Sequence, residues 1–325
     1  MARTIPAAPL AALIALCSCF LFTGIGFTGV GSAQQRTPIL DAPPGDTGRR
    51  ITEDGLLANY FPASQKGPAL LTLTGSVGGL TMNDVAIALQ SEGFSVLHLS
   101  YFRGPGQNAN AELIPLEYFA TALTWLRRQP EVDPGRVGIV GVSKGAEAAL
   151  VVAVRHPELK AVVAALPSSV VWPGIVTEQR AGTISSSWSE QGKPIPHLPH
   201  RPFDASKAGT MADNYAASLK AVSAHPEAVI PVERVAGSLF LVCAEQDRIW
   251  PSCPMARQIH ERLRANGRDA TLLAYPDAGH ASFGLPVSAD DPRLTASGGT
   301  VEGNRTARSD SWMKAITFLK GALGR

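Results

Sequence analysis

Short apolar runs alternate with longer amphipathic stretches along most of the chain. Runs of strand length that are apolar on both faces are typical of strands buried in a parallel sheet, and stretches with apolar residues three or four apart are typical of helices. The predicted strands cover residues 56–61, 69–75, 94–101, 136–142, 161–167, 238–243 and 270–275. The predicted helices cover residues 81–93, 112–130, 144–156, 254–267 and 309–323. Strands that alternate with helices predict an α/β fold whose mainly parallel sheet is covered on both faces.

The alternation is interrupted between residues 168 and 229, where Pro, Gly, Ser and His are frequent. Regular alternation resumes after this stretch. An irregular segment between two regular halves favours a cap over the sheet rather than a second domain.

The first 33 residues have a different pattern. Arg3 is their only charge, residues 7–30 are apolar, and the small residues GVGSA end at Ala33. This pattern predicts a secretory signal peptide that is cleaved near Ala33, followed by one α/β domain over residues 34–325. The alternative is an uncleaved membrane anchor, because the apolar run is nearly long enough to span a bilayer. With cleavage, the protein is exported to the periplasm or secreted.

Composition adds few constraints. The 325 residues are 45% hydrophobic and 17% charged, with 29 basic and 27 acidic side chains. Without Arg3 the net charge is close to zero, so nothing predicts a nucleic acid or an anionic membrane as a partner. The predicted mature chain keeps Cys243 and Cys253, which in an oxidising compartment either form a disulfide or remain separate buried thiols. Two cysteines without histidines at ligand spacing predict no metal site, and no motif predicts a cofactor.

The sequence GVSKG, residues 141–145, joins a predicted strand to a predicted helix. Ser143 lies on the bend, with Gly141 two residues before it and Gly145 two residues after it. Such a bend strains its central residue and brings the strand and the helix very close, so that flanking glycines avoid clashes. The pattern predicts a nucleophile elbow that exposes the Ser143 hydroxyl near a helix N-terminus.

A serine nucleophile needs a histidine as base and a carboxylate that orients the histidine. In open parallel sheets reactive groups gather beyond the carboxyl ends of the strands. Asp247 and His280 each follow a predicted strand in this way, and the order Ser143, Asp247, His280 is the order of α/β-hydrolases. Asp277 is nearer to His280 in sequence, but we interpret it as a turn residue. We place His197 and His200 in the cap or at the surface.

The developing oxyanion needs two hydrogen-bond donors. The first prediction is the backbone N–H of Lys144, which follows the nucleophile. The second donor comes from the glycine-rich loop TGSVGGL after the strand at residues 69–75, where Ser76 is the first choice and Val77 the second.

Several longer motifs resemble the C-terminal catalytic domain of the acyl-CoA thioesterase and bile-acid-CoA:amino-acid N-acyltransferase family. They are GSVGGL, LEYFATALTWL, GIVGVSKGAEAAL, IPVERVAGSLFLVCAEQDRIWPS and AYPDAGH, and the resemblance runs from about Glu53 to the end. The resemblance implies an α/β-hydrolase fold and a triad of Ser143, Asp247 and His280. The amino-acid-conjugating branch of the family uses cysteine as its nucleophile, so a serine favours hydrolysis.

The leading hypothesis is therefore an exported serine hydrolase that cleaves a small acyl ester or thioester through an acyl-enzyme. The second hypothesis is an acyltransferase that passes the acyl group to an amine or an alcohol. A third hypothesis, a binding protein that keeps the fold without catalysis, conflicts with the presence of all three triad residues.

Overall fold

A sheet of eight strands organises the residues that the computed structural model describes, which are 47–176, 183–201 and 209–324. Its strand order is β1-β2-β4-β3-β6-β7-β10-β11. Neighbours from β4 to β11 are parallel, whereas β2 is antiparallel to both β1 and β4. The strands are β1 (Arg49–Ile51), β2 (Leu57–Phe61), β3 (Gly67–Leu73), β4 (Ser95–Ser100), β6 (Val132–Val142), β7 (Ala161–Ala165), β10 (Ser238–Ala244) and β11 (Thr271–Tyr275). The predicted mainly parallel α/β sheet is confirmed.

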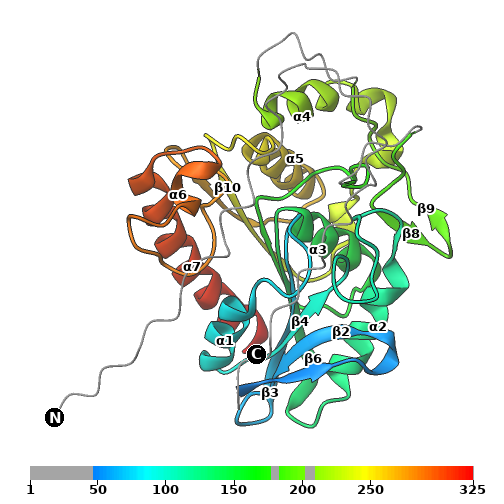
Figure 1. Cartoon of the computed structure of the whole chain (residues 1–325), viewed down its shortest axis with the longest axis vertical. Coiled ribbons are helices and arrows are strands. Elements are labelled where there is room, and N and C mark those ends of the chain that lie inside the picture. The colour runs from blue at the N-terminus through cyan, green and yellow to red at the C-terminus, as the bar shows by residue number, and fades with distance from the viewer. Residues whose placement is uncertain (1–46, 177–182, 202–208, 325) are drawn as a thin grey trace, which may run out of the picture. The chain divides into compact units, whose positions relative to one another are not determined.

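Helices cover both faces of this sheet, as the alternation predicted. They are α1 (Asn83–Ser91), α2 (Leu116–Arg127), α3 (Lys144–Arg155), α4 (Met211–Leu219), α5 (Ser252–Ala265), α6 (Arg293–Ala296) and α7 (Val301–Leu323). Single 3₁₀ turns lie at Glu53–Gly55 (η2), Val222–Ala224 (η3), Pro226–Ala228 (η4) and Val232–Arg234 (η5). Figure 1 shows α1 and α7 together on one side of the strands and α2 and α3 on the other.

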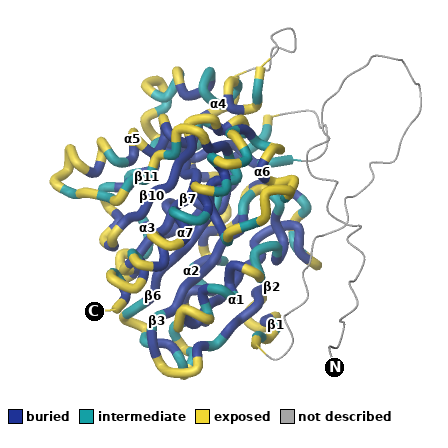
Figure 2. The backbone as a smooth tube through the Cα atoms, turned by 90° about the vertical axis from the view of Figure 1, so that its left-hand side faces the viewer, coloured by how far each residue is buried: buried dark blue, intermediate teal, exposed yellow. Residues whose placement is uncertain are grey.

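The core divides at the sheet into two apolar layers, because successive side chains of a strand point to opposite faces. In β10, Leu239 and Leu241 pack in the layer that holds α2, α3 and α5, while Phe240 and Val242 pack in the layer that holds α1 and α7. In Figure 2 the strands β3, β6, β7 and β10 are buried along most of their length, and most exposed residues lie on the outer surfaces of the helices and in the loops.

The last helix, α7, begins at Val301 rather than near residue 309. The Thr300 side chain accepts a hydrogen bond from the Gly303 N–H at 2.9 Å and so caps the helix. The first half of the helix buries polar side chains, including Asn304 and Arg308, which interrupts the apolar period from which a helix is predicted.

The predicted cap segment, residues 168–229, is irregular where it is described. It contributes α4, two 3₁₀ turns and the hairpin β8 (Trp188–Glu190) to β9 (Lys193–Pro194), and β8 pairs with the short strand β5 (Ile114–Pro115). Apolar residues of the segment pack on Trp250 and Met255, at and just after the loop that follows β10. Residues 177–182 and 202–208 lie outside the described residues.

The predicted signal peptide, residues 1–33, also lies outside the described residues. Within the described ranges, none of the helices combines the length and the apolar character that crossing a bilayer requires.

Candidate active site

Ser143 lies on the turn between β6 and α3, as predicted from the sequence. Its backbone has φ 58° and ψ −121°, in the positive-φ region that a residue with a side chain rarely adopts. The Ser143 N–H donates a hydrogen bond to the Ala165 carbonyl at the end of β7, at 2.8 Å. This bond holds the strained turn at the carboxyl edge of the sheet.

The two glycines around Ser143 are required by close backbone contacts. A Cβ on Gly141 would lie 2.0 Å from the Gly145 carbonyl oxygen. A Cβ on Gly145 would lie 2.4 Å from the carbonyl oxygens of both Leu73 and Thr74, at the end of β3. Since real Cβ atoms do not approach that closely, any side chain at either position would push α3 away from the sheet.

His280 lies between Ser143 and Asp247. Its Nε2 is 2.9 Å from Ser143 Oγ, and its Nδ1 is 2.8 Å from Asp247 Oδ2. The Asp247 side chain is only 2% exposed and that of His280 is 15% exposed. With the Nδ1 proton donated to Asp247, the Nε2 lone pair accepts the hydrogen bond of the Ser143 hydroxyl.

The second oxygen of Asp247 fixes the carboxylate. Asp247 Oδ1 accepts hydrogen bonds from the backbone N–H groups of Ile249 at 2.9 Å and Trp250 at 3.3 Å. These bonds hold the carboxylate with Oδ2 directed toward His280. Trp250 also packs edge-on against the His280 ring, with 6.1 Å between ring centroids.

Asp277 lies exposed in the turn after β11. Its carbonyl oxygen accepts the Thr300 N–H at 2.9 Å, and its carboxylate receives a long contact of 3.5 Å from the Gln246 side-chain amide. These contacts fit the predicted turn role, whereas His280 makes its carboxylate contact with Asp247.

A segment that the sequence reasoning missed supports the His280 loop. A Cβ on Gly279 would lie 2.2 Å from the Gly298 carbonyl, so the two loops pass in direct backbone contact. The buried Asn304 accepts the Gly279 N–H at 2.9 Å and donates to the Gly298 carbonyl, also at 2.9 Å. The Gly298–Gly299 pair was the available signal, because adjacent glycines often mark a close backbone approach.

The predicted oxyanion donors lie around the elbow. Lys144 is the first residue of α3, so its N–H has no carbonyl one turn earlier in the helix. Gly75 lies against the nucleophile, since a Cβ there would be 3.1 Å from Ser143 Cβ. Ser76 and Val77 form the turn that follows, and their N–H groups donate to no backbone carbonyl among the described residues. Their role at the oxyanion stays a prediction.

Cys243 and Cys253 form a disulfide with 4.9 Å between their Cα atoms. Of the two alternatives for these cysteines, the structure contains the bridge. Cys243 lies in β10 and Cys253 in α5, so the bridge closes the loop that carries Asp247.

Aromatic rings of the cap lie close to the triad. Trp172 stacks on His200 with 5.4 Å between centroids and meets Tyr215 edge-on at 4.8 Å. Tyr215 in turn contacts Trp250, at 6.0 Å, and Trp250 contacts His280. His200 lies in the cap segment, one of its two predicted locations. Its ring belongs to an aromatic cluster that extends to His280. In the described part of the chain, no group of three or more His, Cys, Asp or Glu side chains is arranged to hold a metal ion.

The sheet topology and the position of Ser143 on the turn between β6 and α3 are those of the α/β-hydrolase fold. Solved structures with this fold include a putative dienelactone hydrolase from Klebsiella pneumoniae, with a TM-score of 0.51, 15% identity, and coverage of 84% of this chain and 96% of that one. A puromycin-hydrolysing peptidase from Mycobacterium tuberculosis has a TM-score of 0.55 and 14% identity, covering 85% of this chain and 39% of that one. At such identities the likeness concerns the fold alone.

The chain belongs to the family described as "BAAT / Acyl-CoA thioester hydrolase C terminal", whose sequence model matches residues 114–325. The predicted resemblance is thereby confirmed. Acyl-coenzyme A thioesterase 1 of Mus musculus is 27% identical over 288 residues, which are 84% of this chain and 65% of that protein. The mitochondrial acyl-coenzyme A thioesterase 2 of the same species is 27% identical over 290 residues, which are 84% of this chain and 60% of that protein. The chain thus spans less than two thirds of the length of these relatives.

Proposed function

We propose that this protein is a serine hydrolase that cleaves an acyl thioester or ester through an acyl-enzyme on Ser143. The observation that carries the proposal is the hydrogen-bonded chain of Ser143 Oγ, His280 and Asp247, in which each ring nitrogen has one partner. The names of the relatives, acyl-coenzyme A thioesterases, favour a thioester as the substrate class.

In the proposed reaction His280 Nε2 takes the proton of the Ser143 hydroxyl as Oγ attacks the acyl carbon. The N–H of Lys144 and that of Ser76, or of Val77 as second choice, stabilise the oxyanion of the tetrahedral intermediate. The intermediate collapses with cleavage of the bond to sulfur or oxygen, and the imidazolium returns its proton to the leaving group. Water then attacks the acyl-enzyme by the same route, and Asp247 stabilises the imidazolium in both halves.

Labelling by a fluorophosphonate probe and hydrolysis of acyl-CoA and p-nitrophenyl esters test the proposal. We expect Ser143→Ala to abolish labelling and to lower turnover by at least about 10⁴-fold with the fold retained, because the hydroxyl performs chemistry and little packing. Equal labelling of wild type and Ser143→Ala would exclude Ser143 as the nucleophile. Acyl transfer to an added amine in place of water would favour the acyltransferase hypothesis, and a wild type that neither labels nor hydrolyses would favour a binding protein.

We further propose that residues 1–33 direct export and are removed near Ala33. The support is the apolar composition of this segment and the Cys243–Cys253 bridge, since disulfides persist in oxidising compartments. Mass spectrometry of the exported protein is expected to give an N-terminus near Gln34. An intact chain that begins at Met1 in the membrane fraction would instead indicate an anchor.

A further inference from the structure

A buried ion pair lies directly beside the nucleophile, on the first turn of α3. Lys144 Nζ donates to both carboxylate oxygens of Glu147, at 2.9 Å and 2.8 Å. The Lys144 side chain is 2% exposed and that of Glu147 is fully buried. Burial lowers the pKa of Lys144 and raises that of Glu147, and in each case the charge of the partner opposes the shift.

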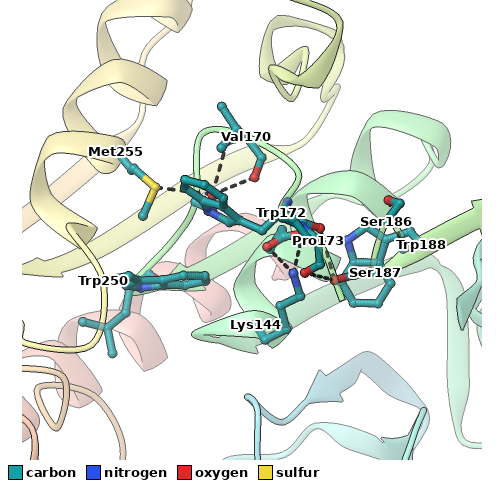
Figure 3. A network of polar contacts seen from close by, with 12 residues as sticks. Lys144, Val170, Trp172, Pro173, Ser186, Ser187, Trp188, Trp250 and Met255 are labelled. Carbon is teal, nitrogen blue, oxygen red and sulfur yellow. Dashed lines mark hydrogen bonds and ion pairs between the residues drawn. The ribbon is translucent and has the colours of Figure 1, made fainter. Parts of the chain in front are cut away.

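The carboxylate of Glu147 also contacts the cap. Its Oε1 accepts the indole N–H of Trp188 at 2.8 Å and the backbone N–H of Trp172 at 3.2 Å. Figure 3 shows Lys144 reaching toward these two tryptophans, and its Nζ lies 5.4 Å from the centre of the Trp188 ring. One carboxylate therefore joins the helix that begins after the nucleophile to two separate parts of the cap.

Stability alone does not explain this arrangement. Transfer of two charges out of water is unfavourable, and an apolar pair of similar volume often gives an equal or more stable fold. An apolar pair offers no hydrogen-bond acceptor. Only an oriented acceptor such as the Glu147 carboxylate binds an indole N–H and a backbone N–H at fixed geometry. The Glu147 N–H in turn donates to the Ser143 carbonyl at 3.2 Å, so the same residue contacts the nucleophile turn and the cap.

We propose that Glu147 is a positioning residue that holds the Ser143 turn in register with the cap. Through its bond to Trp188 it keeps Ser143 Oγ and the Lys144 N–H aligned for attack and oxyanion binding. The role deepens the proposed serine hydrolase function and rests on it.

Two matched substitutions separate this role from packing. Trp188→Phe removes the indole donor to Glu147 and keeps an aromatic ring near Lys144. Trp172→Phe removes an indole N–H that has no hydrogen-bond partner among the described residues, and leaves the backbone bond to Glu147 intact. Both indoles are almost fully buried, at 0% and 1% exposure, so the loss of packing is similar.

We expect Trp188→Phe to lower kcat about tenfold with KM changed less than twofold, because the bond positions reacting groups and does not bind substrate. Trp172→Phe is expected to change kcat less than threefold. In Glu147→Gln, which leaves the Lys144 ammonium without a carboxylate, kcat should fall about a hundredfold. If Glu147→Gln fails to fold, the tryptophan pair still decides the question.

Amide hydrogen exchange of residues 143–147 supplies a readout that needs no turnover. We expect faster exchange in Trp188→Phe than in Trp172→Phe. Equal kcat and equal exchange in the two variants would overturn the proposal and leave the ion pair with a purely structural role. If the wild type neither labels nor hydrolyses, the proposed function fails, while the exchange comparison still decides whether Glu147 fixes the turn.

Discussion

The carboxyl edge of the sheet and the predicted cap segment, residues 168–229, are held in place by different means. At the edge, main chains touch: Gly141 meets Gly145, Gly145 meets the end of β3, and Gly279 meets Gly298. In the cap, side chains make the decisive contacts, through the hydrogen bonds of Glu147 and the rings around Trp172. Direct backbone contacts leave no room for adjustment, whereas side-chain contacts can be exchanged with little movement of the main chain. We therefore expect the edge to tolerate no added side chain at these glycines and the cap segment to tolerate substitution at some of its positions.

The sharpest test of the edge compares its two carboxylates, and it has the largest expected effect. Asp247→Asn favours the wrong tautomer of His280 with little steric change. We expect turnover to fall by on the order of 10⁴, equivalent to about 5 kcal/mol of activation free energy. Asp277→Asn is expected to lower turnover less than about tenfold, because His280 makes its carboxylate contact with Asp247 and Asp277 is an exposed turn residue.

Steady-state kinetics on acyl-CoA and ester substrates measure both effects, and equal thermal stability of the two mutants is the control. A severe Asp277→Asn and a mild Asp247→Asn would mean that the acid is misassigned. The contrast between the edge and the cap would then fail, because the contacts at the edge would position Asp247, a carboxylate that does not act in catalysis.

A second test substitutes a glycine in each region. Gly145→Ala places a Cβ 2.4 Å from two carbonyl oxygens of the sheet. We expect a loss of at least about 3 kcal/mol in the free energy of unfolding, since the helix cannot approach the strand. Gly192→Ala in the β8–β9 turn meets no atom within 4 Å, and its φ of +73° is the only strain. That strain amounts to about 1 kcal/mol.

Urea unfolding of the two variants measures the difference. If Gly145→Ala is as stable as Gly192→Ala, the main chains at the elbow can separate, and the contrast between a rigid edge and an adjustable cap is wrong.

The same contrast explains what the sequence could predict. The strands and most helices follow from the period of the apolar residues, and the turn at Ser143 follows from the two glycines that its close backbone contacts require. Asp247 and His280 were chosen by their positions after strands. Glu147 was missed because a charged residue on a helix indicates an exposed face, and its partners Trp172 and Trp188 lie far along the chain. Asn304 was missed for a related reason. A buried polar side chain interrupts the apolar period, and the sequence does not indicate which groups it bonds to.

The third test concerns His98, a buried histidine of β4 that braces the start of α1 beside the predicted oxyanion loop. Its Nδ1 is 3.1 Å from Thr72 Oγ1, and its Nε2 accepts the Met82 N–H at 3.1 Å. Burial, with a smaller contribution from the charge of Arg50, lowers the pKa of His98 to about 4 from 6.5. Protonation of His98 Nε2 would turn this acceptor into a donor, so that two N–H groups, those of His98 and Met82, would face each other.

Because the folded-state pKa is lower than the unfolded value, the folded state binds fewer protons between pH 6.5 and pH 4. The stability that neutral His98 contributes is therefore present above pH 6.5 and is lost as the pH falls toward 4. We expect the free energy of unfolding to fall by about 2 kcal/mol at pH 5 and about 3 kcal/mol at pH 4 from this residue, relative to pH 7. His98→Gln should be less stable than wild type at pH 7, because it lacks the neutral imidazole. It should lose less stability on acidification, because glutamine does not titrate. Hydrogen exchange at pH 5 should rise first in residues 74–82, with little change in residues 186–190 of the cap. An equal loss of stability in His98→Gln and wild type would mean that a group other than His98 causes the acid sensitivity. The buried Lys144–Glu147 pair, which joins the elbow to the cap, would then be the next group to test.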